Sequence, residues 1–215
     1  MSKLPVIAID GPAASGKGTI ARRIAAALGF AHLDTGTLYR VVGLSVLRRG
    51  ADPTDVQAAK TAVQSLDLSL LEDPALRAHS TSVAASKVAG ILIVREALLS
   101  FQRDFAAHPP GGKGAVLDGR DIGTAICPDA KVKLYVTAAP EARAHRRFLE
   151  LTRNGSQITE GEVLADIRAR DARDSGRAVA PLKQAPDAHL LDTTHLDIEA
   201  AAERALEIVR TVLRT

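Results

Sequence analysis

The segment that most constrains the fold of this chain is GPAASGKGT at residues 11–19, a glycine-bounded stretch with a lysine near its end. It follows an apolar run at residues 4–9, which has the length and the β-branched content of a buried strand. Residues 20–28 have the apolar spacing of a helix, and Gly29 predicts where that helix ends. A strand, such a loop and a helix in this order predict a phosphate-binding loop. A glycine-rich turn with an exposed lysine is the alternative.

The residue types in this loop suit anion binding. Glycines let the backbone curl without a Cβ, so that several N–H groups turn inward. These groups and the positive end of the following helix form a cradle for phosphate. Lys17 supplies a charge for the outer phosphates of a nucleotide, and a hydroxyl just after it can hold Mg²⁺. Gly18 occupies the position where the general pattern has Ser or Thr, and Thr19 comes next.

The composition is that of a globular protein and excludes several other classes. A chain of 215 residues suits one domain with an embellishment. A net charge of +3, 3% aromatic residues and the absence of tryptophan argue against a nucleic-acid partner. With one cysteine, Cys127, and no paired-histidine spacing, a transition-metal site is not expected. No apolar run approaches the ~20 residues of a membrane span, and no signal-peptide core is present. We therefore expect a cytoplasmic protein without a membrane partner.

The remainder of the chain alternates between strand-like and helix-like segments. Strands are expected at residues 115–117, 131–137 and 189–193, with a short segment at 31–33. Helices are expected at residues 41–47, 55–65, 83–88, 91–105, 160–170 and 198–213, and from residue 140. Residues 66–82 give the weakest signal for secondary structure, and residues 68–71 are expected to form a short strand. Together these segments predict an α/β fold whose central parallel sheet of about five strands has helices on both faces.

Polar residues follow two of the predicted strands. Asp34 and Thr35 come after residues 31–33 and either bind a ligand or cap the next helix. Asp118 follows residues 115–117, where a carboxylate can help to organise Mg²⁺ through water. Arg120 lies between Asp118 and Asp121, which suits a polar, anionic ligand. A charged turn with internal pairing is the alternative.

Residues 143–177 are rich in arginine and contain no lysine. The rigid fork of arginine suits bidentate phosphate contacts, whereas a face that is merely solvated usually includes lysine as well. The alternative is a solvent-exposed helix face with pairs such as Asp166–Arg170.

Six segments in this order resemble the bacterial cytidylate kinase family, nucleoside monophosphate kinases of the P-loop type that phosphorylate CMP and dCMP. They are GPAASGKGT at 11–19, DTGTLYR at 34–40, VREALL at 94–99, DGRDIGT at 118–124, RAHRRF at 143–148 and RDARDSGRAVAPL at 170–182. The resemblance implies a P-loop NTPase fold that forms a single kinase domain over residues 1–215. It also implies a CMP-binding insertion at about 51–90, shortened here relative to the family's usual version, and a mobile lid at about 143–177.

The resemblance also implies roles for individual residues. ATP would contact Gly11, Pro12, Ala13, Ala14, Ser15, Gly16, Lys17, Gly18, Thr19, Arg143 and Arg147, with Arg146 also at the start of the lid. CMP would contact Thr35, Tyr39, Arg40, Ser86, Arg95, Gly119, Arg120, Asp121, Arg170, Asp174 and Arg177. Among these, Asp174 would hold the sugar hydroxyls and the arginines would hold the α-phosphate. Catalytic roles would fall to Lys17, Arg120, Asp121 and Arg177. Thr19 and the ATP phosphates would hold Mg²⁺, the expected cofactor.

The expected activity is in-line transfer of a phosphoryl group from ATP to CMP or dCMP by a monomeric enzyme. A P-loop kinase of another small acceptor, such as UMP, AMP or shikimate, is the nearest alternative. A nucleic-acid-associated NTPase, whose arginines would bind a polyanion, is the alternative from a different class.

Overall fold

The computed structural model describes residues 4–213, which divide into two compact units. The first, called the sheet unit here, contains the residues up to 33 and those from 104 onward. The second, called the helical unit, contains residues 34–103. Each is described by itself. Among the described residues, no helix is long and apolar enough to cross a membrane.

A five-stranded sheet organises the sheet unit, with the strand order β2-β3-β1-β4-β5. The strands are β1 (Val6–Asp10), β2 (Ala31–Asp34), β3 (Ala115–Gly119), β4 (Val132–Thr137) and β5 (His189–Asp192). The pairs β1–β3, β1–β4 and β4–β5 are parallel, with Val6 opposite Ala115 and Leu134 opposite His189. Because parallel strands end at the same edge, the loops after β1, β3 and β4 all leave from one edge of the sheet. The predicted α/β fold with a five-stranded parallel sheet is confirmed.

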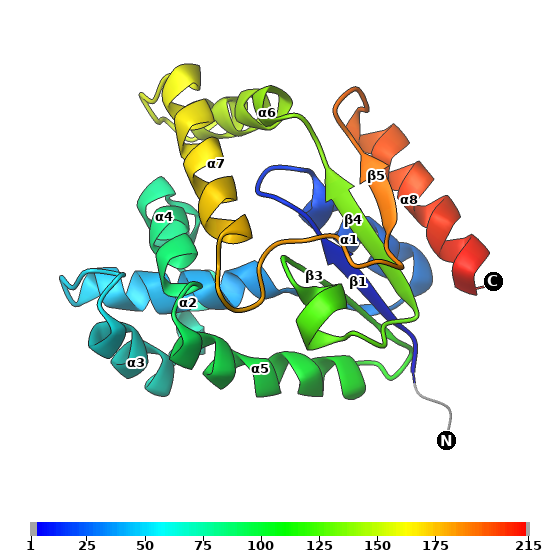
Figure 1. Ribbon diagram of the computed structural model, residues 1–215, viewed down its shortest axis with the longest axis horizontal. Coiled ribbons are helices and arrows are strands. Elements are labelled where there is room, and N and C mark those ends of the chain that lie inside the picture. Colours follow the sequence, from blue (N-terminus) through cyan, green and yellow to red (C-terminus); the bar gives the residue numbers. More distant parts are fainter. Residues whose placement is uncertain (1–3, 214–215) are drawn as a thin grey trace. The chain divides into compact units, whose positions relative to one another are not determined.

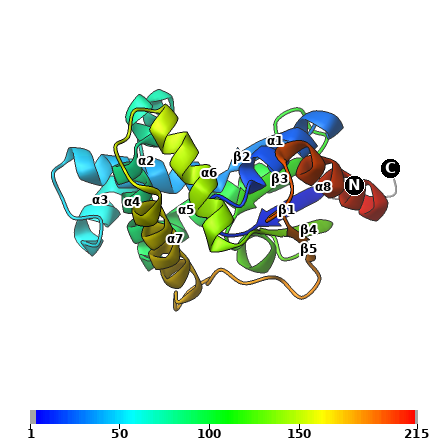
Figure 2. The same cartoon turned by 90° about the horizontal axis from the view of Figure 1, so that it is seen from above.

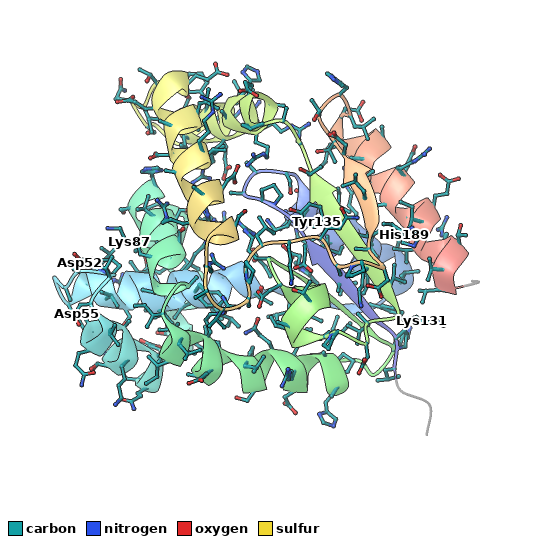
Figure 3. All side chains as sticks on the ribbon, viewed as in Figure 1. Asp52, Asp55, Lys87, Lys131, Tyr135 and His189 are labelled. Carbon is teal, nitrogen blue, oxygen red and sulfur yellow. The ribbon has the colours of Figure 1, made fainter. Side chains whose placement is uncertain are left out.

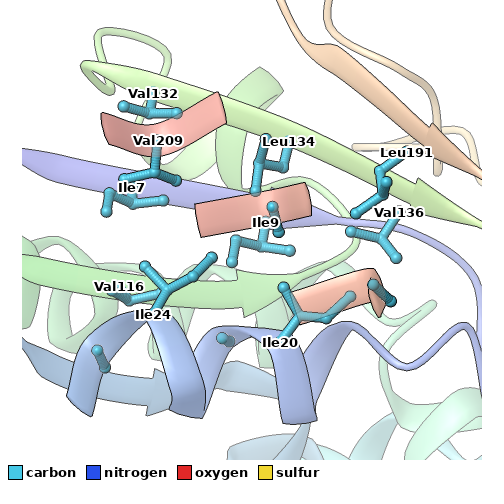
Figure 4. Close-up of a cluster of buried hydrophobic side chains, with 14 residues drawn as sticks. Ile7, Ile9, Ile20, Ile24, Val116, Val132, Leu134, Val136, Leu191 and Val209 are labelled. Carbon is cyan, nitrogen blue, oxygen red and sulfur yellow. The ribbon is translucent and has the colours of Figure 1, made fainter. Parts of the chain in front are cut away.

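One face of the sheet is covered by α1 (Lys17–Leu28) and α8 (Ile198–Leu213), as Figure 1 and the close-up in Figure 4 show. Alternate strand residues point to this face, including Ile7 and Ile9 of β1. Ile20 and Ile24 lie one helical turn apart on α1 and meet them, together with Val209 of α8. This dry core fixes the start of α1 relative to the end of β1, and so holds the loop between them.

Two further helices of the sheet unit, α6 (Pro140–Arg153) and α7 (Glu160–Ser175), pack against each other and run side by side in Figure 2. Their contact is an apolar cluster of Ala144, Leu151, Val163 and Ile167. Proline at the first position of α6 fits because that position needs no N–H donor. Thr159 begins α7 with a reciprocal capping box to Glu162, which satisfies two otherwise unpaired N–H groups.

The helical unit contains α2 (Thr35–Arg48), α3 (Val56–Gln64), α4 (His79–Val88), most of α5 (Leu92–Ala107) and two 3₁₀ turns, η1 (Leu68–Glu72) and η2 (Pro74–Arg77). Its helices α2 and α4 approach so closely that a Cβ at Gly43 would lie 2.8 Å from the backbone nitrogen of Ala85.

Before α3, hydrogen bonds from Thr54 lower the pKa of Asp52, with a smaller effect from the charge of Lys87 nearby (Figure 3).

Two features of this unit differ from what its sequence predicts. Residues 68–71 are not a strand but part of η1, because the Asp67 side chain accepts the N–H of Ser69 and starts a tight turn. Helix α2 begins at Thr35, six residues before the predicted start, because Leu38 and Tyr39 already lie on the buried face that continues with Val42.

Candidate active site

The loop between β1 and α1 has the backbone of a phosphate cradle. Gly16 lies just before α1 in a left-handed conformation, with φ of 87°. Gly11 has φ of 154°, and a Cβ there would lie 1.9 Å from the carbonyl oxygen of Val136. Ala14 also has a positive φ, of 58°. The carbonyl of Gly16 accepts the N–H groups of Thr19 and Ile20 at 3.1 Å, so the helix starts directly at the loop and its positive end faces an anion bound there.

Polar side chains surround the beginning of α1. The Lys17 amine lies back over the loop and donates to the Pro12 carbonyl at 3.2 Å. The hydroxyl of Thr19 accepts from Arg22 at 3.2 Å. A Cβ at Gly18 would lie 3.6 Å from Oδ2 of Asp118, so this carboxylate at the end of β3 comes next to the loop. His32, which is not among the residues predicted from sequence, contacts Oδ1 of Asp118 at 2.7 Å.

These groups fit Mg²⁺ bound together with a nucleotide. The described part of the chain contains no group of three or more His, Cys, Asp or Glu side chains that could hold a metal ion alone. Mg²⁺ in phosphoryl-transfer sites is held mainly by substrate phosphates and water, with one or two protein oxygens. Thr19 and Asp118, which lie beside the phosphate loop, can supply these one or two protein oxygens.

The arginines of α6 contact main-chain oxygens and carboxylates of both α6 and α7. Arg143 is buried and donates to the carbonyls of Ala138 and Ala13, at 2.8 and 3.2 Å. It also makes a bidentate pair with Asp171. Arg147 pairs with Glu150 at 2.8 Å, and its buried Nη2 has no hydrogen-bond partner among the described residues.

Asp174 on α7 is the centre of a cluster of charged residues. Its side chain is fully buried, and three guanidinium groups face it, from Arg120, Arg170 and Arg177. Nε of Arg120 donates to Oδ2 at 2.9 Å, Nε of Arg170 lies 3.8 Å from the same oxygen, and Arg177 donates to Oδ1. Burial alone would raise the pKa of the Asp174 carboxyl, but the charges of the three arginines outweigh it and lower the pKa. The cluster keeps a net positive charge.

The segment after β3 is held by a carboxylate that was not predicted from sequence. Asp10, the last residue of β1, accepts the N–H groups of Ile122 and Gly123 at 2.7 and 2.8 Å. These two residues begin the π-helical turn η3 (Ile122–Ile126). The predicted site residues Gly119 and Asp121 lie just before this turn and also belong to the sheet unit. Burial raises the pKa of Asp10 to about 6, although the two amide hydrogen bonds oppose the rise. Its position at the end of a buried strand is the signal that could have identified it.

The remaining predicted residues lie in the helical unit. Thr35 is the first residue of α2 and is buried. On the same helix, Tyr39 lies under the guanidinium of Arg95, 5.8 Å from the ring centroid. Nη1 of Arg95 donates to the Ala89 carbonyl at 3.2 Å. Two more predicted residues, Arg40 and Ser86, are on α2 and α4. Arg40 donates to Leu76 at 3.3 Å, and Ser86 is buried.

Within the sheet unit, the structure thus brings together two groups of the predicted residues. A phosphate loop follows the first strand of a parallel sheet, and an arginine cluster surrounds a single buried carboxylate. This fold and this loop define a nucleotide-binding protein of the P-loop NTPase class.

Comparison with known proteins identifies the family. The model of the family described as "Cytidylate kinase" matches residues 7–211. The chain is 57% identical over 207 residues to a cytidylate kinase of Bradyrhizobium sp. (strain ORS 278), which covers 96% of each chain. It is 58% identical over 205 residues to a cytidylate kinase of Rhodospirillum rubrum, which covers 95% of this chain and 96% of that one. The chain belongs to the cytidylate kinase family.

Among solved structures, an uncharacterized protein from Eubacterium ventriosum has a similar fold. Its TM-score is 0.54 and its sequence identity 13%, and the match covers 98% of this chain and 99% of that one. At this level of identity the likeness concerns the fold alone.

Proposed function

We propose that this protein transfers the terminal phosphoryl group of ATP to CMP or dCMP, giving ADP and CDP or dCDP. The observation that carries this proposal is the match to the cytidylate kinase family over residues 7–211. The geometry of the sheet unit supports it, because a phosphate cradle and a positively charged arginine cluster suit a donor and an acceptor that are both anionic.

The chemistry needs positioning and charge stabilisation more than proton transfer. The attacking oxygen of a nucleoside monophosphate is already anionic at neutral pH, so a strong general base is not required. The backbone of residues 11–19 would bind the ATP phosphates, and the Lys17 amine would leave Pro12 to contact the transferred group. Mg²⁺, held by the phosphates with Thr19 and Asp118, would neutralise charge on the phosphate oxygens when it is bound.

Two arginines of α6 are proposed to act on the donor side. Arg147 has a buried Nη2 without a hydrogen-bond partner among the described residues, which suits a contact with ATP. Arg143 would support ATP binding from beneath the loop, because it donates a hydrogen bond to the carbonyl of Ala13.

The arginine cluster around Asp174 is proposed to bind the monophosphate. Arg120 and Arg177 would contact the α-phosphate, together with Arg170, and the carboxylate would accept the sugar hydroxyls. A carboxylate offers about four acceptor positions, so Asp174 can accept from guanidinium groups and still bind a hydroxyl. The contacts proposed for CMP in the helical unit are those expected from sequence, made by Thr35, Tyr39, Arg40, Ser86 and Arg95.

We further propose that residues 51–90 form the CMP-binding insertion of a single kinase domain and that residues 143–177 form a lid. A lid that closes over ATP would exclude water and so limit wasteful hydrolysis. The protein is also proposed to be a cytoplasmic, monomeric enzyme that has no nucleic-acid partner.

A panel of acceptors tests the assignment. With ATP and Mg²⁺ held constant, kcat/KM is measured for CMP, dCMP, UMP, AMP and shikimate. CMP or dCMP is expected to give the highest value. AMP or shikimate used at least as efficiently as CMP would contradict the cytidylate assignment. ATP hydrolysis that needs no acceptor, joined to tight and salt-sensitive binding of single-stranded RNA, would instead favour the nucleic-acid-associated NTPase.

A further inference from the structure

Three consecutive residues of the phosphate loop are each held from the side of α6. The first is Ala13, whose carbonyl oxygen accepts from Nη1 of Arg143 at 3.2 Å. Arg143 is only 3% exposed and is itself fixed by Asp171 and by the carbonyl of Ala138. Its bond to Ala138, which precedes the proposed lid, fixes this donor at the base of the lid, next to the loop.

The second residue, Ala14, is held by packing. Its side chain contacts the apolar cluster between α6 and α7 that contains Ala144 and Ile167. Ala14 has φ of 58°, which is unfavourable for a residue with a Cβ and persists only where the surroundings impose it. The contact with the α6–α7 cluster is one such constraint.

The third residue, Ser15, is held through a relay. Its carbonyl oxygen accepts from the buried hydroxyl of Thr193 at 3.0 Å, and this hydroxyl accepts from Nη1 of Arg146 at 3.0 Å. The hydroxyl also lies 3.1 Å from the carbonyl of Thr137, but that oxygen already accepts the N–H of Thr193 at 2.8 Å. A hydroxyl has one proton to donate, and the Ser15 carbonyl is both the nearer acceptor and the one not already engaged by the N–H of Thr193.

The consequence for phosphate binding follows from the planarity of the peptide group. In a trans peptide the C=O of one residue and the N–H of the next point in opposite directions. A donor on the Ala13 oxygen therefore orients the N–H of Ala14, and a donor on the Ser15 oxygen orients the N–H of Gly16. Both N–H groups belong to the loop that is proposed to bind phosphate.

We infer that Thr193 and Arg146 are positioning residues that, with Arg143, hold the loop in its phosphate-binding conformation. They act on the carbonyl side of the loop and leave its N–H side for the nucleotide. A loop ordered before binding loses less conformational entropy when phosphate binds, so the effect is on affinity for the nucleotide. This inference rests on the proposed role of residues 11–19 in binding the phosphates of ATP.

The test is the dissociation constant of ADP, measured by calorimetry without any acceptor, for Thr193→Val and Arg146→Gln. Each variant is expected to bind ADP about tenfold more weakly than the wild type. Thr193→Val removes the buried hydrogen bond to the Ser15 carbonyl. Arg146→Gln removes the donor that orients this hydroxyl, together with the bonds of Arg146 to the carbonyls of Thr193 and Leu196. The double variant should be little worse than either single variant, since both changes break the same relay. Thr193→Ser keeps the hydroxyl and should bind ADP within about twofold of the wild type.

Two controls separate positioning from general stability. Thr211→Val removes an exposed hydroxyl that also bonds a main-chain carbonyl, that of Glu207, on α8. Arg204→Gln removes an exposed arginine from the same helix. Both should leave ADP affinity unchanged. Unchanged ADP affinity in both Thr193→Val and Arg146→Gln would overturn the inference. Wild-type protein that binds ADP but does not phosphorylate CMP would contradict the proposed function alone.

Discussion

The two buried carboxylates of the sheet unit, Asp10 and Asp174, are stabilised in opposite ways. Asp10 is bonded to two neutral backbone N–H groups, and burial raises its pKa. Asp174 faces three guanidinium groups, whose charges lower its pKa in spite of its burial. Around the phosphate loop, the contacts are thus made mainly to main-chain atoms that leave little space, whereas in the proposed acceptor region charged side chains face one another. Steric changes should therefore damage the first region most, and changes of charge the second.

The largest effect is expected where main-chain geometry leaves no space. Gly11→Ala would place a Cβ 1.9 Å from the carbonyl oxygen of Val136, an atom of the sheet that cannot move aside. We expect a loss of more than about 4 kcal/mol in the free energy of unfolding, measured by urea denaturation. Gly111 also has a positive φ, of 81°, but a Cβ added there would meet none of the described atoms within 4 Å. Gly111→Ala should therefore cost only about 1 kcal/mol. Equal effects of the two changes would show that steric exclusion at Gly11 is unimportant.

Lys17→Ala should be nearly as damaging to turnover but should leave the fold intact. The lysine lies over the loop, where it donates to Pro12, and is proposed to bind the transferred phosphate. We expect kcat to fall by about 10³-fold, the scale of losing one charged group that stabilises the transition state. The thermal midpoint should stay within about 3 °C of the wild type. Lys131→Ala, at an exposed position labelled in Figure 3, is the control for loss of a lysine. Normal turnover of Lys17→Ala would contradict the assignment of the loop.

In the proposed acceptor region, the largest effect is expected at its centre. Asp174→Asn leaves Arg120, Arg170 and Arg177 facing one another without the carboxylate. We expect a loss of about 3–5 kcal/mol in the free energy of unfolding, the usual scale for breaking a buried ion pair on one side. High salt should recover little of it, because buried charges are screened much less than exposed ones. A variant as stable as the wild type at low salt would show that the arginines do not depend on this carboxylate.

The contrast between the two regions also shows what could be predicted from sequence. The phosphate loop was predictable because its strand, loop and helix are adjacent in the chain. Arg170 and Arg177 could be placed near Asp174 because they are four and three residues from it on or next to one helix. The contact between Arg120 and Asp174 spans 54 residues, and the one between Thr193 and Ser15 spans 178, so no local pattern indicates either. The short strand predicted at 68–71 was wrong because the side chain of Asp67 starts a turn there.

The pH dependence of stability should show the raised pKa of Asp10. Its pKa is about 6 in the folded protein against an ordinary value of 3.8, so between these values the folded state binds more protons than the unfolded state. Stability should therefore fall as the pH rises from about 4 to about 6, by up to about 3 kcal/mol from this group. The measurement is urea denaturation at pH 4 and pH 6.5 for the wild type and Asp10→Asn. The variant should lose this part of the pH dependence, and an identical pH dependence in both proteins would contradict the assignment. Tyr135, opposite Asp10 on β4 and labelled in Figure 3, titrates well above this range because burial, and to a lesser extent the charge of Asp10, raises its pKa.

The smallest effect is expected from removing one arginine of the cluster. Arg177→Ala leaves Asp174 paired with Arg120 and Arg170, so the free energy of unfolding should fall by only about 1 kcal/mol. Because Arg177 is proposed to contact the α-phosphate of the acceptor, its loss should raise KM for CMP about tenfold and leave KM for ATP unchanged. The matched control is Arg168→Ala, since Arg168 is exposed on α7, the helix that ends just before Arg177, and pairs with Glu141 at the surface. If Arg177→Ala changed KM for ATP alone, the cluster would belong to the donor side, and the contrast between the two regions would not correspond to donor and acceptor.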